Sequence, residues 1–221
     1  MKKTIISCVL FLTAVTAFSQ TPMKTAAEAK LSASDLAVKI ADRILATTTY
    51  EFKNTKTGKT YKSVKNLPLD MNVKVACKYN NWHYTNGVTH IALMELADKT
   101  GAKKYDDYVL KNMNFVFNEG NLDFFKKQYD QAMKNEGWYG VRKLSWHMIF
   151  RGKRLDDNGP MGASLIDLQM KHPNNSFLNY INETAEHLNY GEPRLADGTI
   201  ARIWPHENTI WADDAFMAIS F

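Results

Sequence analysis

The sequence predicts a mainly helical protein, and two observations support this fold class. Apolar residues recur at the spacing of amphipathic helices, as Leu36, Ile40 and Ile44 show. Signals for strands are sparse, and Gly, Ser or Asn residues separate the helical stretches at short intervals. We therefore expect an all-α fold of helices paired by short turns, without a repeat of fixed period.

The expected elements follow one another from residue 34. The first helix has Ser34 as its N-cap and ends at the threonine run 47–49. The lysine-rich segment 51–75 is expected to form a loop or a short hairpin. Gly101 is expected to end the helical stretch before it, and Gly120 follows the next helical stretch. Further helices are expected at 86–99, 104–118, 122–134, 142–150, from Asp157 onward, from a cap at Ser176 to 188 and from about 208, with a loop or hairpin at 191–205.

Length and composition indicate one globular domain that follows an export signal. The 221 residues are 45% hydrophobic and 12% aromatic, which is enough for a sizeable core. Two early lysines, an apolar run and an Ala-Phe-Ser site are typical of a signal peptide, and the run is too short to span a membrane. The alternative is a buried N-terminal helix. The expected division is a signal peptide at 1–20, a leader at 21–33 and a folded domain at 34–221.

The net charge, the cysteine content and the spacing of the histidines exclude some classes of function. Loss of the two lysines with residues 1–20 lowers the formal net charge from +5 to +3, and no basic stripe remains that would bind nucleic acid. The mature chain keeps Cys77 and therefore no internal disulfide, which suits an exported protein of the periplasm or the exterior without a membrane segment. His83 and His206 lack the spacing of metal ligands, so we expect no metal.

Two pairs of adjacent Asp residues, the acidic doublets, are the strongest indication of the chemistry of this protein. Asp156 and Asp157 lie in Leu-Asp-Asp-Asn-Gly-Pro-Met-Gly-Ala, and Asp213 and Asp214 lie in Trp-Ala-Asp-Asp-Ala-Phe-Met. Carboxylates are rarely buried unless they are paired or in use, and an aromatic neighbour at an apolar helix favours a raised pKa. The doublets therefore suggest carboxylate chemistry on a neutral polar substrate, with sugar as the leading candidate. The alternative for each is an N-cap or first-turn carboxylate.

With the block Asn-Trp-His-Tyr-Thr-Asn-Gly-Val at 81–88, the two doublets resemble the unsaturated rhamnogalacturonyl hydrolases in order and spacing. These enzymes form glycoside hydrolase family 105 and are related to the unsaturated glucuronyl hydrolases of family 88. The resemblance covers about residues 35–221 and implies an (α/α)6 barrel of six helical hairpins around a central cleft. It also implies that the chain holds little more than the first half of such a barrel. The apolar ending at Phe221 likewise leads us to expect a truncated chain.

The activity that this resemblance implies is not ordinary glycoside hydrolysis. The substrates are oligosaccharides left by polysaccharide lyases, whose terminal uronic acid carries a C4=C5 double bond. An Asp protonates the double bond, water adds at C5, and the resulting hemiketal opens and releases the neighbouring sugar. The resemblance implies neither a metal nor an organic cofactor.

By motif position, Asp213 matches the general acid/base of the family, and Asp157 matches its second active-site Asp. Trp211 and Phe216 would give Asp213 a low-dielectric wall. Gly159, with Gly162 beyond it, would let backbone and ligand approach closely.

Other residues are weaker candidates for substrate binding. In the first block, Trp82 and Tyr84 would stack on the sugar and His83 would bind a hydroxyl, with a core aromatic cluster as the alternative. Arg202 is a candidate partner of the uronate carboxylate, with a solvated surface charge as its alternative. His206 precedes the catalytic helix, and its role is open. Three further residues complete the list, Arg154 and Lys153 as alternatives to Arg202 and His147 as a core histidine.

Two other functions stay open. One is an inactive remnant or a helical protein that binds glycan. The other is a different (α/α)6 enzyme such as an inverting glycosidase, whose paired carboxyls lie about 6.5–9.5 Å apart.

Overall fold

The computed structural model of the chain describes residues 32–151, 155–203 and 205–219, and of Asp157 and Ile219 it describes the backbone only. The expected signal peptide and most of the expected leader lie outside these residues, as do Lys153 and Arg154. Contacts divide the chain into two units, residues 1–39 and residues 40–221. The described residues are mostly helical, so the predicted fold class is confirmed.

The helix α2 (Ala33–Thr47) spans the boundary between the two units. Ser32 closes its first turn, because the Asp35 N–H donates to Ser32 Oγ (3.1 Å) and the Ser32 N–H donates to the Asp35 carboxylate (3.2 Å). The cap is therefore Ser32 and not the expected Ser34, since only a residue three positions before Asp35 allows this reciprocal pair. In the second unit Ile44 packs against the core, whereas Ile40 stays half exposed.

A small antiparallel sheet occupies the segment that was expected to be a loop or hairpin. Phe52 pairs with Tyr61 on one side and with Val75 on the other. Alternate residues of the strands are buried, which places Phe52 and Val75 in the core. The strands, in the spatial order β2-β1-β3, are β1 (Phe52–Asn54), β2 (Thr60–Tyr61) and β3 (Val73–Val75).

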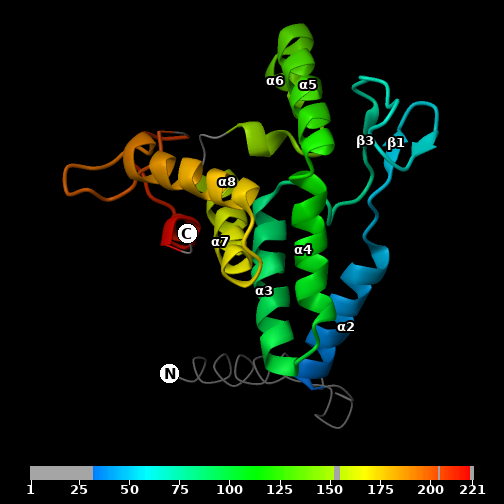
Figure 1. Cartoon of the computed structure of the whole chain (residues 1–221). Coiled ribbons are helices and arrows are strands. Elements are labelled where there is room, and N and C mark those ends of the chain that lie inside the picture. Colours follow the sequence, from blue (N-terminus) through cyan, green and yellow to red (C-terminus); the bar gives the residue numbers. More distant parts are fainter. Residues whose placement is uncertain (1–31, 152–154, 204, 220–221) are drawn as a thin grey trace, which may run out of the picture. The chain divides into compact units, whose positions relative to one another are not determined.

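The remaining elements are helices joined by short turns, and Figure 1 shows α3 beside α4, with α7 on the other side of α3. Gly101 ends α3 in the left-handed conformation (φ 70°), which confirms that prediction. Gly120 lies in the first turn of α5, which Asn118 caps and which therefore begins before the expected residue 122, and Asn174 rather than Ser176 caps α8. The helices are α3 (Tyr84–Thr100), α4 (Lys104–Val116), α5 (Glu119–Glu136), α6 (Trp138–Val141), the 3-10 turn η2 (His147–Phe150), α7 (Leu155–Lys171), α8 (Asn175–Glu186), the π-helical turn η3 (His187–Gly191) and α9 (Ala212–Ile219).

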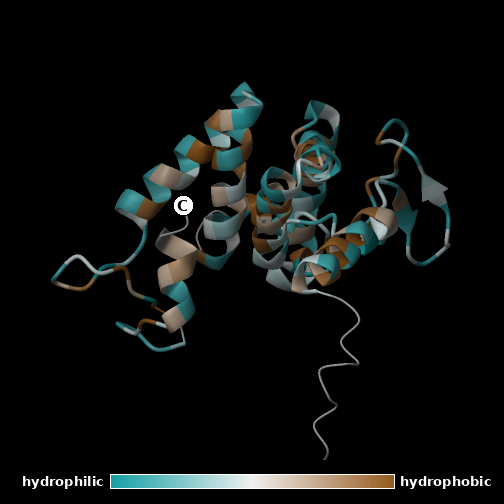
Figure 2. Ribbon diagram, turned by 90° about the horizontal axis from the view of Figure 1, so that it is seen from below, coloured by the Kyte–Doolittle hydropathy of each residue, from teal (hydrophilic) through white to brown (hydrophobic). Residues whose placement is uncertain are grey.

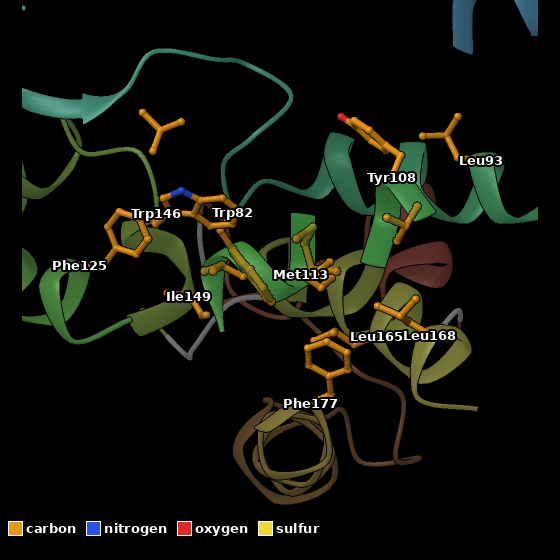
Figure 3. Packing of buried hydrophobic residues seen from close by; sticks show 14 of the residues in the cluster. Trp82, Leu93, Tyr108, Met113, Phe125, Trp146, Ile149, Leu165, Leu168 and Phe177 are labelled. Atoms are coloured by element: carbon orange, nitrogen blue, oxygen red, sulfur yellow. The ribbon is translucent and has the colours of Figure 1, made fainter. Parts of the chain in front are cut away.

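The core lies among α3, α4, α5, α7, α8 and the sheet. Figure 2 shows apolar and polar residues interleaved along the helices, as amphipathic helices require. The close view in Figure 3 shows aromatic and aliphatic side chains from several elements meeting in one cluster. Its largest fully buried members include Trp82, Trp146, Tyr105, Phe52, Phe177, Met113, Met161, Leu165 and Leu168.

Two glycines allow three helices to pack at backbone contact. A Cβ on Gly87 of α3 would lie 2.4 Å from the backbone carbon of Pro160 in α7. A Cβ on Gly159 of α7 would lie 1.8 Å from the carbonyl oxygen of Met217 in α9. The close approach expected at Gly159 is therefore that of a neighbouring helix backbone, and α7 is held between α3 and α9.

Candidate functional site

The first turns of α3, α7 and α9 carry a connected group of polar side chains. His83 caps α3, and its Nδ1 accepts the Thr85 N–H (3.3 Å). Burial lowers the pKa of His83 below its ordinary value, and the nearby charge of Asp156 in α7 opposes this. Asp156 in turn accepts a hydrogen bond from Arg202 (3.2 Å), which also binds Asp214 in α9. These contacts bring the two acidic doublets and the 81–88 block to one region.

The strongest interaction in this region joins Arg202 to Asp214. Arg202 Nε donates to both carboxylate oxygens of Asp214 (2.8 and 2.7 Å), and Nη2 donates to one of them as well. The Asp214 side chain is only 5% exposed, and its Oδ2 also accepts the Trp211 N–H (2.8 Å). Burial alone would raise the pKa of Asp214, but the hydrogen bonds from Arg202 and from the Trp211 N–H lower it below its usual range.

Backbone pairing with Thr209, ahead of α9, holds Arg202 in place. The Arg202 N–H donates to the Thr209 carbonyl (2.8 Å), and the Asn208 N–H donates to the Arg202 carbonyl (2.9 Å). Asn208 adopts the left-handed conformation (φ 59°), and Thr209 Oγ1 donates to the His206 carbonyl (2.7 Å). Because of these contacts α9 begins at Ala212, later than the expected start near residue 208. The Arg202 guanidinium lies 4.2 Å from the ring centroid of Trp211.

The second doublet is thereby split into one buried and one exposed carboxylate. Adjacent residues on a helix point about 100° apart, and Asp213 is exposed next to the buried Asp214. Trp211 and Phe216 are each 46% exposed. The expectation that they surround Asp213 with a low-dielectric wall is wrong for the described residues, because the carboxyl faces solvent.

The first doublet differs from the prediction in its local structure. Neither Asp156 nor Asp157 is an N-cap, because α7 already begins at Leu155. The backbone of Asp157 lies in the first turn of α7, and its side chain lies outside the described part of the chain. A cleft shared by Asp157 and Asp213 stays a prediction.

The aromatic block divides into core and surface. Trp82 is 1% exposed and belongs to the buried cluster shown in Figure 3. Its ring packs edge-on against Tyr180 (4.8 Å between centroids), so the prediction that it stacks on sugar is wrong. Tyr84 is 38% exposed and lies against the ring of His83 (4.6 Å). Tyr84 therefore keeps a face for a ligand. His147 is buried, as predicted.

Arg202 and His206 also differ from their predicted settings. Arg202 is neither a solvated surface charge nor a free partner for a uronate, because its Nε and Nη2 already bind Asp214 and Asp156. His206 is exposed in the turn that precedes α9, where its role stays a prediction.

A cavity of about 280 Å³ adjoins the Arg202–Asp214 pair. One wall carries His187, the first residue of the π-helical turn η3, and Glu192, which follows that turn; His187 Nε2 and Glu192 Oε1 are 3.0 Å apart. Burial raises the pKa of Glu192, and the neighbouring His187 opposes this. The cavity is lined by Leu155, Asp156, His187, Gly191, Glu192, Pro193, Ile200, Ala201, Arg202, Ile203 and Asp214.

The sequence interpretation missed His187 and Glu192, because π-helical turns have no reliable sequence signature. Part of the Arg202–Asp214 pair could have been found, since Trp211 and Asp214 have the spacing at which a first-turn acid binds a backbone N–H. Within the described residues, no group of three His, Cys, Asp or Glu residues could hold a metal ion. No helix of the part that the structure describes is long and apolar enough to cross a membrane.

The helical fold, with carboxylates and exposed aromatic rings at adjoining helix ends, suits an enzyme that acts on carbohydrate. Residues 54–221 match the family model of Glycosyl Hydrolase Family 88, and the chain belongs to this family. It is therefore a glycoside hydrolase, broadly of the unsaturated uronyl hydrolase type. The match contains all three motif blocks. No curated protein matches the chain.

Proposed function

We propose that this protein removes the terminal C4=C5 unsaturated uronic acid from oligosaccharides that polysaccharide lyases produce, as an unsaturated rhamnogalacturonyl hydrolase. Membership of family 88 supports the broad type of reaction. The resemblance of the three motif blocks to family 105 supports the narrower substrate, in which the neighbouring sugar is rhamnose. An oligosaccharide is thus the proposed partner.

In the proposed reaction, Asp213 acts first as an acid and then as a base. Its carboxyl gives a proton to C4 of the double bond, and the carboxylate then takes a proton from the water that adds at C5. The C5 hemiketal opens to a ketone as the bond from C5 to the ring oxygen breaks. The hemiacetal that remains at C1 then releases the neighbouring sugar. Asp213 ends the cycle protonated, so protons balance.

The observation that supports this proposal most directly is that the two carboxylates of the second doublet differ in exposure. Asp214 is buried, and both of its carboxylate oxygens already accept hydrogen bonds from Arg202. Asp213 is exposed on the same turn, two residues after the half-exposed Trp211. A carboxyl that exchanges protons with a substrate needs such access.

The remaining roles are proposed from exposure and, for Asp157, from motif position alone. Trp211 and Tyr84 offer ring faces that suit the apolar face of a sugar. Asp157 is proposed to hold the substrate or the attacking water, in agreement with its motif position. His83 lies beside Tyr84 and is proposed to bind a hydroxyl group.

The experiment compares two disaccharides that differ only in the double bond of the uronic acid. We expect the protein to release rhamnose from the unsaturated compound, in step with loss of the ultraviolet absorbance of the double bond. The saturated compound should stay intact, because it has no double bond to protonate. Equal cleavage of both compounds would instead indicate an ordinary glycosidase.

We also propose that residues 1–20 direct export to the periplasm or beyond. Mass spectrometry of the exported protein should show an N-terminus near Gln20 or Thr21. An intact Met1 on the exported protein would contradict this.

A further inference from the structure

The Arg202–Asp214 pair is the most extensively bonded ion pair among the described residues, and the proposed reaction does not use it directly. Several donors converge on the carboxylate of Asp214, and the side chain is almost fully buried. A buried ion pair gains little net stability over apolar residues of the same volume, so its presence calls for another reason.

The pair fixes the beginning of α9 in two ways. Asp214 accepts the Trp211 N–H (2.8 Å), which sets the backbone on either side of Asp213. The guanidinium of Arg202 lies over the Trp211 ring, which sets the orientation of that ring. Arg202 is itself anchored by its backbone pairing with Thr209. Both surface groups that are proposed to meet the substrate thus depend on this pair.

The pair also controls the charge around Asp213. The pKa of Arg202 is raised, chiefly by its hydrogen bond to Asp214, and the charges of Asp156 and Asp213 contribute to this. Asp214 and Asp156 neutralise the positive charge of Arg202 through their hydrogen bonds with its guanidinium. Without them an uncompensated positive charge would lie near the proposed acid.

We infer that Arg202 and Asp214 are positioning residues for Asp213, an inference that rests on the proposed function. Asp214 neutralises Arg202 and holds the first turn of α9, so that Asp213 and Trp211 face the substrate without an uncompensated positive charge near the acid. Other charged or titratable groups around the pair are Asp156 from α7, His83 at the cap of α3, and His187 and Glu192 after α8.

The test uses Asp214→Asn, Arg202→Gln and the double variant, with pH profiles of kcat/KM on the unsaturated disaccharide. Asp214→Asn keeps an oxygen for the Trp211 N–H but leaves Arg202 less neutralised. We expect its alkaline limb to move to lower pH by roughly half a unit to one unit, and its activity to fall about tenfold. Arg202→Gln removes the positive charge and should move the limb to higher pH. The double variant should bring the limb back to that of the wild type.

Opposite shifts from the two single variants would not follow from structural damage alone. The matched control is Asp130→Asn, which breaks the exposed Lys126–Asp130 pair on α5 and should leave the profile unchanged. If the pair variants lose activity without any shift of the profile, the pair is merely structural and the inference is wrong. Cleavage of the saturated disaccharide would overturn the proposed reaction instead, so the two failures are distinguishable.

Discussion

Replacement of Gly159 by Ala tests how α9 is held against α7. The added Cβ would lie 1.8 Å from the Met217 carbonyl oxygen, whereas real Cβ atoms essentially never approach closer than 3.0 Å. The two helices must therefore separate by at least about 1.2 Å at this point, and backbone atoms cannot give way as a flexible side chain does. Overpacking of this kind costs about 1–3 kcal/mol or more, which exceeds the gain of about 1 kcal/mol for Gly→Ala within a helix.

The same displacement should reach the site, because α9 carries Asp213. A misplacement of about 1 Å can cost about 10²-fold in rate, so kcat/KM should fall by about that factor. The assays are urea unfolding and cleavage of the unsaturated disaccharide. The matched control is Gly120→Ala on α5, where the nearest atoms would lie at an ordinary 3.5 Å. A Gly159→Ala protein with wild-type stability and activity would refute the reasoning.

Two further predictions concern stability. Burial lowers the pKa of His90 from 6.5 to about 4, so the unfolded chain binds a proton at a higher pH than the folded protein does. The free energy of unfolding should therefore fall as pH drops from 6.5 to 4, and the loss should reach about 3 kcal/mol at pH 4. Urea unfolding at several pH values should show this loss in the wild type and a smaller loss in His90→Asn. Gln128→Leu should lower the free energy of unfolding by about 1–3 kcal/mol. Gln128 donates to the Asp70 and Val73 carbonyls (2.7 Å each), and the variant would leave both without this donor. An unchanged unfolding midpoint would contradict this.

Much of the helical fold could be predicted from the spacing of apolar residues and from the glycine that ends a helix. Gly101 ends α3 where the sequence placed the end, because only a residue tolerant of positive φ suits that position. Helix starts were less accurate, since Ser32 and Asn174 compete with nearby polar residues as caps. Such competition is decided by which side chain reaches a free N–H, and spacing alone does not show this.

The candidate site was predicted less completely than the fold. Motif positions indicated both doublets, but not that Asp214 would be buried on Arg202. That pairing joins residues 12 positions apart through a turn with Asn208 in the left-handed conformation, which has no periodic signature. Trp82 shows the converse problem, because an aromatic residue suits a sugar platform and a core equally well until its burial is known.

The most direct test of the account is the kcat/KM of Asp213→Asn, measured as loss of the ultraviolet absorbance of the unsaturated disaccharide. The amide is nearly isosteric but cannot donate and retake a proton, so the rate should fall by about 10²–10⁴-fold. The fold should be kept, because the side chain is exposed and the loss of a charge at the helix N-terminus costs only about 0.3–1 kcal/mol. An Asp213→Asn protein that is folded and as active as the wild type would contradict the central claim.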